Sequence, residues 1–528
     1  MSMQLRFSAV TLLLMSLGLM VSCSKKDELP GTAPTSISSA KNGGKPQFHQ
    51  GTMFYALTNA NELVQYNTGR PLYEMGSVTI SGLPTDEKII AIDFRPATGQ
   101  LYGLGKNSRI YSINPMNGRA NAIGSSSFSL AISGEVAGFD FNPTVDRIRL
   151  VTNTGQNLRL HPETGMVVAI DGMLNPGSPS VSAVAYTNNF AGATATTLYD
   201  IDAAADKLYI QNPPNNGGLM EVGSLGVLAT GEAGFDIAPD NSLALAALFG
   251  RGDEDGGSEQ SPGNKYRFYS IDLQTGAAMN LGKTDRMILG VAIPTSPVAY
   301  AVDGSNVLHI FNPWQTASMI NKNITGLRAG ETILGIDMRP VNGQLYALGS
   351  TSRLYSINTA NGMATVIGIP FSTPLSGTSF GFDFNPTVDR IRVVSNTGQN
   401  LRLHPVTGAV AATDMILNPG TPMVDAAAYT NNFAGATATT LYDIDISTDK
   451  LYIQNPPNNG TLVEVGALNI NADAHNGFDI GGTSGKAYAI LTSNGNTKLY
   501  SIDLTTGNAT AMGMFPVSVR GFAIGLGF

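Results

Sequence analysis

An aspartate between apolar residues recurs along this chain and is the first candidate for chemistry. It stands in AIDFRP, GFDFNP and GFDIAP, and again in GIDMRP, a second GFDFNP and GFDIGG; the six residues are Asp93, Asp140, Asp236, Asp337, Asp383 and Asp479. In AVAYTNN and AAAYTNN, Tyr186 and Tyr429 stand where further members are expected. A ring of carboxylates can hold a cation, but a regular aspartate beside a tight turn more often accepts backbone N–H groups. We therefore predict a structural role for the six aspartates and no metal site.

Polar side chains in several turns form a second candidate, because these turns are nearly unchanged between the two halves of the chain. Residues 138–162 recur at 381–405 with two mild changes, and residues 207–217 recur unchanged at 450–460. Amides, a carboxylate, a guanidinium, an imidazole and a phenyl ring together suit hydrogen bonding and stacking on a polar ligand. We predict that one pocket is bordered by Asp146, Arg147, His161, Asn188, Asn189, Phe190, Asn212 and Asn215. A second pocket is predicted at the equivalent residues Asp389, Arg390, His404, Asn431, Asn432, Phe433, Asn455 and Asn458.

The unchanged turns could also arise without a ligand, in either of two ways. A recent duplication followed by exchange of sequence would keep the halves alike, since packing alone tolerates many apolar substitutions. Asn and Pro are also the residues that form tight turns for purely structural reasons. The fifth repeat of each half has by contrast diverged, with NSLALAALFGRG in the first half against GKAYAILTSNGN in the second.

The remaining motifs do not indicate catalysis. Of the five histidines only His161 and His404 correspond between the halves, which is too few for a multi-histidine metal site. GTSFG, residues 377–381, matches the nucleophile elbow G-x-S-x-G but lacks its strand–turn–helix context. GRGDEDGGSEQSPGN, residues 250–264, is largely an insertion in the first half and predicts a flexible, solvated loop. We predict no catalytic residue and no cofactor.

Short strands are the elements that position these residues. QLYGLG, RIYSINP and RANAIG follow the first aspartate and are separated by turns rich in Asn and Gly, and similar trios follow the other members. Each unit therefore predicts four strands with alternating apolar residues. Four-stranded units that recur about every 40–50 residues indicate the blades of a β-propeller. The predicted fold class is all-β.

Each half of the chain, residues 51–294 and residues 297–528, contains five such units. The chain begins at the second strand of a unit, MFYALT, and ends on a first strand, VRGFAIGLGF, which can complete a ring and leave no open edge. If each half closes on itself, the fold is two tandem five-bladed β-propellers; otherwise it is one ten-bladed ring. We favour two five-bladed propellers, because each half has a complete set of strands and the size of a domain.

Several long motifs together resemble one bacterial family. AIDFRPATGQLYGLG, GFDFNPTVDRIR, NTGQNLRLHP and AYTNNFAGATATTLYDID are similar to the family called domain of unknown function 4394, and the resemblance extends over residues 53–528. It implies a tandem repeat of a secreted, propeller-like domain without an assigned activity, and it brings no catalytic residues.

The N-terminal residues predict export and a lipid anchor. Residues 1–22 combine a basic start, a short apolar run and the site LMVSC, which resembles the lipobox of a lipoprotein signal peptide. Cys23, the one cysteine of the chain, is the predicted lipidation site. Residues 23–50 are rich in Ser, Gly, Pro and Lys and predict a flexible tether. We therefore expect a protein of the bacterial cell envelope, anchored by lipid to the outer membrane and exposed at the surface.

Composition and charge narrow the function classes further. A formal net charge of −8 without a basic cluster gives no support for nucleic-acid binding. Polysaccharide hydrolysis needs two carboxylates in unequal environments, and no acids that break the repeat pattern are shared by both halves. We favour a non-catalytic binding or scaffold protein for a glycan, peptide or protein partner. The alternative is a secreted polysaccharide-acting hydrolase or lyase on the same scaffold.

Overall fold

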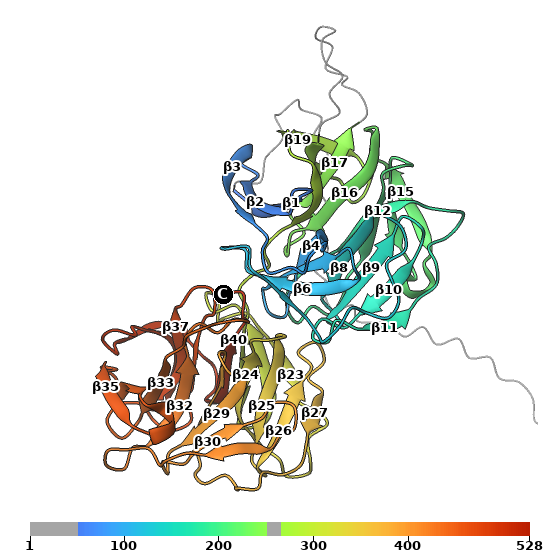
Figure 1. The fold of residues 1–528 in the computed structure, drawn as a ribbon. Helices are drawn as coiled ribbons and strands as arrows, with labels where there is room; N and C mark the ends of the chain where they lie inside the picture. Colours follow the sequence, from blue (N-terminus) through green and yellow to red (C-terminus); the bar gives the residue numbers. More distant parts are fainter. Residues whose placement is uncertain (1–50, 251–265) are drawn as a thin grey trace, which may run out of the picture. The chain divides into compact units, whose positions relative to one another are not determined.

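The computed structural model describes residues 51–250 and 266–528. These residues form ten four-stranded antiparallel sheets (Figure 1), with no α-helix among them and two short 3-10 turns, η1 (Pro214–Asn216) and η2 (Pro457–Asn459). No helix in this part of the chain is long and apolar enough to span a membrane. The predicted signal peptide, Cys23, the tether and insertion residues 251–264 lie outside the described residues.

The first half contains five sheets, numbered here in chain order. In order of pairing, the first sheet is β20 (Ile288–Ala292), β1 (Met53–Thr58), β2 (Glu62–Asn67) and β3 (Arg70–Thr79). The second is β4 (Ile89–Phe94), β5 (Leu101–Gly105), β6 (Arg109–Ile113) and β7 (Ala120–Ala122); the third is β8 (Ala137–Asn142), β9 (Arg147–Thr152), β10 (Asn157–Leu160) and β11 (Val167–Ile170). The fourth is β12 (Val181–Tyr186), β13 (Leu198–Asp202), β14 (Lys207–Gln211) and β15 (Leu219–Ser224); the fifth is β16 (Ala229–Ile237), β17 (Ala244–Gly250), β18 (Tyr266–Ile271) and β19 (Ala278–Thr284).

The second half repeats this arrangement. Its first sheet is β40 (Val519–Ile524), β21 (Ala299–Asp303), β22 (Val307–Phe311) and β23 (Met319–Asn323). The second is β24 (Ile333–Arg339), β25 (Gln344–Gly349), β26 (Arg353–Ile357) and β27 (Ala364–Ile367); the third is β28 (Phe380–Asn385), β29 (Arg390–Ser395), β30 (Asn400–Leu403) and β31 (Val410–Thr413). The fourth is β32 (Val424–Tyr429), β33 (Leu441–Asp445), β34 (Lys450–Gln454) and β35 (Leu462–Ala467); the fifth is β36 (Gly477–Ile480), β37 (Ala487–Ser493), β38 (Asn496–Ile502) and β39 (Ala509–Met514).

The last strand of each half pairs with the first strand of that same half. In the first half β20 pairs with β1, with Ala292 opposite Tyr55. In the second half β40 pairs with β21, with Ala523 opposite Tyr300. Each half therefore completes its first sheet from its own two ends, and β20 and β21 belong to different sheets.

Burial distinguishes the innermost strand of each sheet from the outermost one. β12 is buried along its whole length, because the innermost strands of the adjacent sheets, β8 and β16, pack beside it. The outermost strand β11 alternates between half-buried and exposed residues, which is the pattern of a strand with one solvated face. Apolar side chains fill the layers between neighbouring sheets; Ile201 of the fourth sheet and Phe235 and Leu248 of the fifth belong to one such layer.

A direct backbone contact joins the fourth sheet of each half to the segment that connects it with the third sheet. Isolated parallel bridges link Asn175 to Gly218 in the first half and Asn418 to Thr461 in the second. Gly217, which ends turn η1, has a φ of 69°, and a Cβ there would lie 2.2 Å from the carbonyl oxygen of Met173. Only glycine fits this left-handed position under such a close approach, so the turn sequence is constrained by the segment that precedes β12.

Candidate functional site

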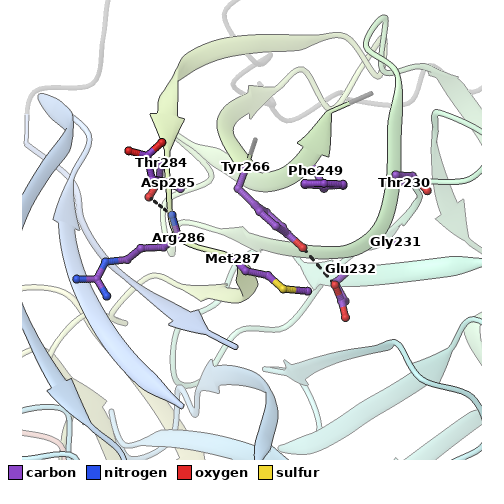
Figure 2. A pocket seen from close by; sticks show the side chains of 9 residues that line it. All are labelled: Thr230, Gly231, Glu232, Phe249, Tyr266, Thr284, Asp285, Arg286 and Met287. Carbon is purple, nitrogen blue, oxygen red and sulfur yellow. Dashed lines mark hydrogen bonds between the residues drawn. The ribbon is translucent and has the colours of Figure 1, made fainter. Parts of the chain in front are cut away.

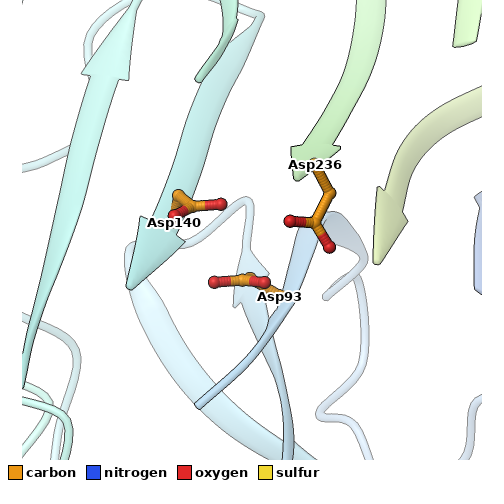
Figure 3. A group of neighbouring side chains, drawn as sticks. All are labelled: Asp93, Asp140 and Asp236. Carbon is orange, nitrogen blue, oxygen red and sulfur yellow. The ribbon is translucent and has the colours of Figure 1, made fainter. Parts of the chain in front are cut away.

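The repeated aspartates come together on the innermost strands of three sheets in each half. In the first half Asp93 on β4, Asp140 on β8 and Asp236 on β16 are buried, and one carboxylate oxygen of each lies within 4.8 Å of the others (Figure 3). The second half has the same arrangement on β24, β28 and β36, formed by Asp337, Asp383 and Asp479. We call these two groups the aspartate triads.

Hydrogen bonds locate the equivalent position on the remaining inner strands. The backbone N–H of Phe141, the residue after Asp140, donates to Asp93, and the N–H of Tyr186 donates to Asp140 in the same way. Tyr186 therefore corresponds to the residue after an aspartate, and Ala185 stands in the aspartate position. The prediction that Tyr186 and Tyr429 occupy this position was wrong by one residue, because the strand pattern alone does not fix the register.

Three aspartates satisfy five backbone donors in each half. In the first half the donors are the N–H groups of Phe94, Phe141, Tyr186, Ile237 and Ile293, at 2.5 to 3.0 Å. In the second half they are those of Met338, Phe384, Tyr429, Ile480 and Ile524, at 2.6 to 3.0 Å. The aspartates thus accept backbone N–H groups as predicted, but from the next residue and the next sheet rather than from the following turn. Each triad ties the five inner strands of its half together.

Burial without an opposite charge raises the pKa of every triad carboxyl. Desolvation raises the pKa of Asp236 to about 7, although the two hydrogen bonds from backbone N–H groups lower that pKa. The pKa values of Asp93 and Asp140 are raised well above the usual range, first by burial and then by the charges of the other triad members. The second triad behaves in the same way, with the pKa of Asp479 raised to about 7. A triad therefore resists carrying three negative charges.

Asp146, Arg147 and His161, three of the predicted ligand residues, lie near one another. Asp146 accepts a bidentate pair from Arg95, with 2.9 Å to Nε, while Arg147 donates to the Asp146 backbone carbonyl. Burial, followed by the positive charges of Arg147 and Arg95, lowers the pKa of His161 to about 4. In the second half Arg339 and Arg390 bond Asp389 in the same way, and Nδ1 of His404 accepts the N–H of Val406.

The predicted residues Asn188, Asn189 and Phe190 lie in the turn between β12 and β13. Asn188 has a φ of 55° and its side chain donates to the carbonyl of Ala195 in the same turn. Asn189 is fully buried, and neither polar atom of its side chain has a hydrogen-bond partner among the described residues. Phe190 is half-buried. The equivalent Asn431 bonds Ala438, Asn432 is buried with an unpartnered Oδ1, and Phe433 is half-buried.

Of the predicted residues in this region, Asn212 lies before turn η1 and Asn215 lies within it, and both are exposed. They differ in their contacts, because Oδ1 of Asn215 accepts a hydrogen bond of 2.8 Å from the buried Arg149. Asn455 and Asn458 repeat the pair in the second half, with Asn458 bonded to Arg392. Asn215 is thus hydrogen-bonded to the buried Arg149. Asp146, Arg147 and His161 form a separate set of contacts.

A buried arginine network, which sequence reasoning missed, joins the third and fourth sheets. Arg149 is 2% exposed and bonds Asn157 at 2.6 Å, Asp171 at 2.7 Å and the Tyr186 hydroxyl at 3.4 Å, besides Asn215. Arg392 makes the same four contacts, to Asn400, Asp414, Tyr429 and Asn458. A buried guanidinium is tolerated only with its partners in place. Within the near-identical residues 138–162 and 381–405, the arginine and asparagine of each network therefore have a structural role.

A cavity of about 430 Å³ lies at the fifth sheet of the first half (Figure 2). Phe249 of β17 and Tyr266 of β18 line it, with ring centroids 5.0 Å apart, and Met287 extends toward them from the other side. Glu232 of β16 accepts a hydrogen bond of 3.1 Å from the Tyr266 hydroxyl. The other lining residues are Thr230, Gly231, Thr284, Asp285 and Arg286. We call this the fifth-sheet pocket.

The polar side chains of the fifth-sheet pocket are held in defined positions. Burial and the adjacent negative charge of Glu232 raise the pKa of Tyr266, so its hydroxyl keeps its proton and donates. Arg286 points away from the rings (Figure 2). It forms ion pairs with Glu62 and Glu74, at 2.7 and 2.8 Å. The pocket therefore presents an aromatic wall beside a fixed carboxylate, and its size lies within the range of small-molecule sites.

The second half lacks these side chains. Strand register places Thr492 of β37 at the position of Phe249, and Thr497 of β38 at that of Tyr266. Phe515 there replaces Thr284 and is buried. The sequences of the fifth repeats differ between the two halves, and this difference is the sequence signal that marks the region of the pocket.

Comparison with known proteins gives a family in both halves. The family model described as domain of unknown function DUF4394 matches residues 62–292 and again residues 307–523. No curated protein matches the chain. A solved structure, the extracellular domain of a protein described as a one-component system, BT4673, from B. thetaiotaomicron, is 12% identical with a TM-score of 0.27. The match covers 88% of this chain and 65% of that chain, and a TM-score this low supports no inference about fold or function.

Proposed function

The chain belongs to the DUF4394 family in both halves, and we propose that it is an exported, lipid-anchored protein that binds a ligand without catalysis. Each half, residues 51–294 and 297–528, would be one five-bladed β-propeller. The pairing of β20 with β1 and of β40 with β21 supports two rings rather than one ring of ten blades. Adjacent inner strands of each half also pack beside one another in cyclic order.

The proposed location follows from the N-terminal sequence. Cys23 would carry the lipid at the outer membrane, with residues 24–50 as a tether and both propellers at the cell surface. Metabolic labelling with a fatty acid should mark the wild type and leave Cys23→Ala unlabelled. Equal labelling of both would contradict a lipid anchor at Cys23.

The fifth-sheet pocket is the observation that carries the proposed binding function. An aromatic wall formed by Phe249 and Tyr266 offers a stacking surface for the apolar face of a sugar ring. Glu232, held by Tyr266, offers an acceptor for ligand hydroxyls. A glycan is therefore the first ligand class to test. The turns around Asn189 and Phe190, and their second-half equivalents, remain a further predicted ligand surface.

A glycan and polysaccharide library tests this proposal, with both binding and product release measured on the purified full chain. We expect binding without product release. Phe249→Ala should weaken binding by at least about tenfold through the loss of aromatic stacking. The matched control, Thr492→Ala at the equivalent position of the second half, should leave affinity unchanged. Release of shortened products by the wild type would instead favour the polysaccharide hydrolase or lyase.

A further inference from the structure

The aspartate triads hold a feature that their role as backbone acceptors does not explain. Six carboxylate oxygens in each triad meet five N–H donors, so one oxygen is left over. In the second half that oxygen is Oδ2 of Asp383, which is buried and has no hydrogen-bond partner among the described residues. A buried, unsatisfied carboxylate oxygen is costly, and it needs a partner.

The position of this unpartnered oxygen indicates what the partner is. Asp383 lies beside Asp337 and Asp479, and one carboxylate oxygen of each lies within 4.8 Å of the others. In the first triad, Figure 3 shows the equivalent Asp140 with one oxygen directed toward the space between Asp93 and Asp236. Among the described residues, the triad carboxylates accept hydrogen bonds from neutral backbone N–H groups. A cation between the three carboxylates would give this oxygen a partner and would balance their negative charge.

Geometry and ligand chemistry narrow the choice of cation. Carboxylate oxygens are the ligands of hard divalent cations, and Ca²⁺ binds them at about 2.4 Å, so its ligands lie within about 4.8 Å of one another. The two remaining inner strands place Ala185 and Ala292 at the aspartate positions of the first half, so no larger side chain enters from them. The backbone N–H bonds also fix the carboxylates in place before any ion arrives.

We propose that each aspartate triad binds one divalent cation, with Ca²⁺ as the first candidate, so that the chain carries two. The cation bridges the inner strands of three sheets and supplies the charge that three buried carboxylates lack. This site lies apart from the fifth-sheet pocket, and the proposal does not depend on what that pocket binds.

Calorimetric titration of the full chain with CaCl₂, after removal of metal with EDTA and dialysis, tests the proposal. We expect two Ca²⁺ per chain in the wild type. Asp383→Asn, which keeps an acceptor for the Tyr429 N–H, should bind one, and the double variant with Asp140→Asn should bind none. Asp200→Asn, which alters a buried acid outside the triads, should still bind two. Circular dichroism confirms that each variant is folded.

Thermal melting of the wild type decides the question even if a triad variant fails to fold. At a Ca²⁺ concentration about 100 times the dissociation constant, the melting temperature should rise by roughly 5–10 °C over the EDTA-treated protein. Two results would overturn the proposal. One is a stripped wild type that takes up no Ca²⁺, Mg²⁺ or Mn²⁺ at millimolar concentration and melts at the same temperature with and without them. The other is folded Asp383→Asn that still binds two Ca²⁺.

Discussion

The third and fourth sheets are almost the same in the two halves of the chain, whereas the fifth sheets differ. In the conserved pair of sheets, Arg149 and Arg392 occupy the same buried position and bond the same four kinds of side chain. In the fifth sheet, Phe249 and Tyr266 of the first half correspond to Thr492 and Thr497 of the second. The two regions have therefore followed different constraints since they were duplicated.

The buried charge of Arg149 and Arg392 explains why the third and fourth sheets differ less between the halves than the fifth sheets do. An apolar contact survives many substitutions of similar volume, but a buried guanidinium loses stability when any one of its partners is removed. The residues that bond Arg149 and Arg392 are accordingly of the same types in both halves. The fifth sheets share the buried aspartates Asp236 and Asp479, whereas the side chains that line the fifth-sheet pocket differ between the halves.

Removing the buried arginine should have the largest effect on stability. Arg149→Ala leaves Asp171 buried at 6% side-chain exposure without its innermost partner, and we expect a loss of about 3–5 kcal/mol in the free energy of unfolding. Arg159 bonds the same carboxylate from a side chain that is 34% exposed. Arg159→Ala should therefore cost at most about 1 kcal/mol. Equal losses for both variants in urea unfolding would show that the buried arginine does not account for the near-identity.

Stability should also respond to pH through Asp443, a buried acid beside the second network. Neither of its oxygens has a partner among the described residues, and burial raises its pKa to about 8. The folded state then holds more protons than the unfolded state between pH 4 and 8. The contribution of Asp443 is therefore favourable at low pH and is lost as pH rises, by roughly 1.4 kcal/mol per unit.

Asp443→Asn removes this titration and reveals its size. Between pH 5 and pH 7 the variant should gain roughly 3 kcal/mol in unfolding free energy relative to the wild type. Urea unfolding of both proteins at the two pH values measures the gain. A difference between the two proteins that stays constant across this range would mean that Asp443 is ionised in the folded protein.

The two predicted ligand residues at turn η1 should differ in their effect on stability. Asn215→Ala removes an acceptor from the charged Arg149, and we expect a loss of about 1.5–2 kcal/mol. Both residues are exposed, but the Asn212 side chain contacts the sulfur of Met220 at 4.0 Å rather than a charged group, so Asn212→Ala should change stability by less than about 0.5 kcal/mol. If the order were reversed, Asn215 would be free for a ligand and the network would not explain its conservation between halves.

The smallest expected effect on stability lies in the fifth-sheet pocket. Tyr266→Phe removes one hydrogen bond to Glu232, and we expect a loss of about 0.5–1 kcal/mol together with weaker ligand binding. Tyr452→Phe is the matched control, because that hydroxyl bonds Thr448 at an exposed site of the second half. Its affinity for the ligand should equal that of the wild type. Loss of binding in the control would place the ligand elsewhere.

Much of the fold could be predicted from the sequence, because strands and turns are local features. The period of about 40–50 residues, the turn residues and the alternating apolar positions indicated ten units of four strands, and ten such sheets are present. Register was harder to predict. Tyr186 was aligned with the aspartates although Ala185 occupies that position, because only the hydrogen bond from Tyr186 to Asp140 fixes it.

The candidate site was less accessible to sequence reasoning. Asn215 in a polar turn has the same composition whether it meets a ligand or Arg149, and nothing in TVDRIR indicates that Arg149 rather than Arg147 is buried. The fifth-sheet pocket depends on side chains from several strands of one half, so the divergence of the fifth repeats marks the region but does not identify the residues that line the pocket. Whether the predicted turn residues bind a ligand is still a prediction.

Ligand stoichiometry tests the contrast between the two regions most directly. Once the library yields a ligand, equilibrium titration of the full chain counts the sites. The fifth-sheet pocket exists in one half, so we predict one ligand per chain, with binding lost in Phe249→Ala and retained when Asn189, Phe190, Asn432 and Phe433 are all replaced by Ala. Two ligands per chain, with both lost in that fourfold variant, would contradict the account and assign binding to the repeated turns.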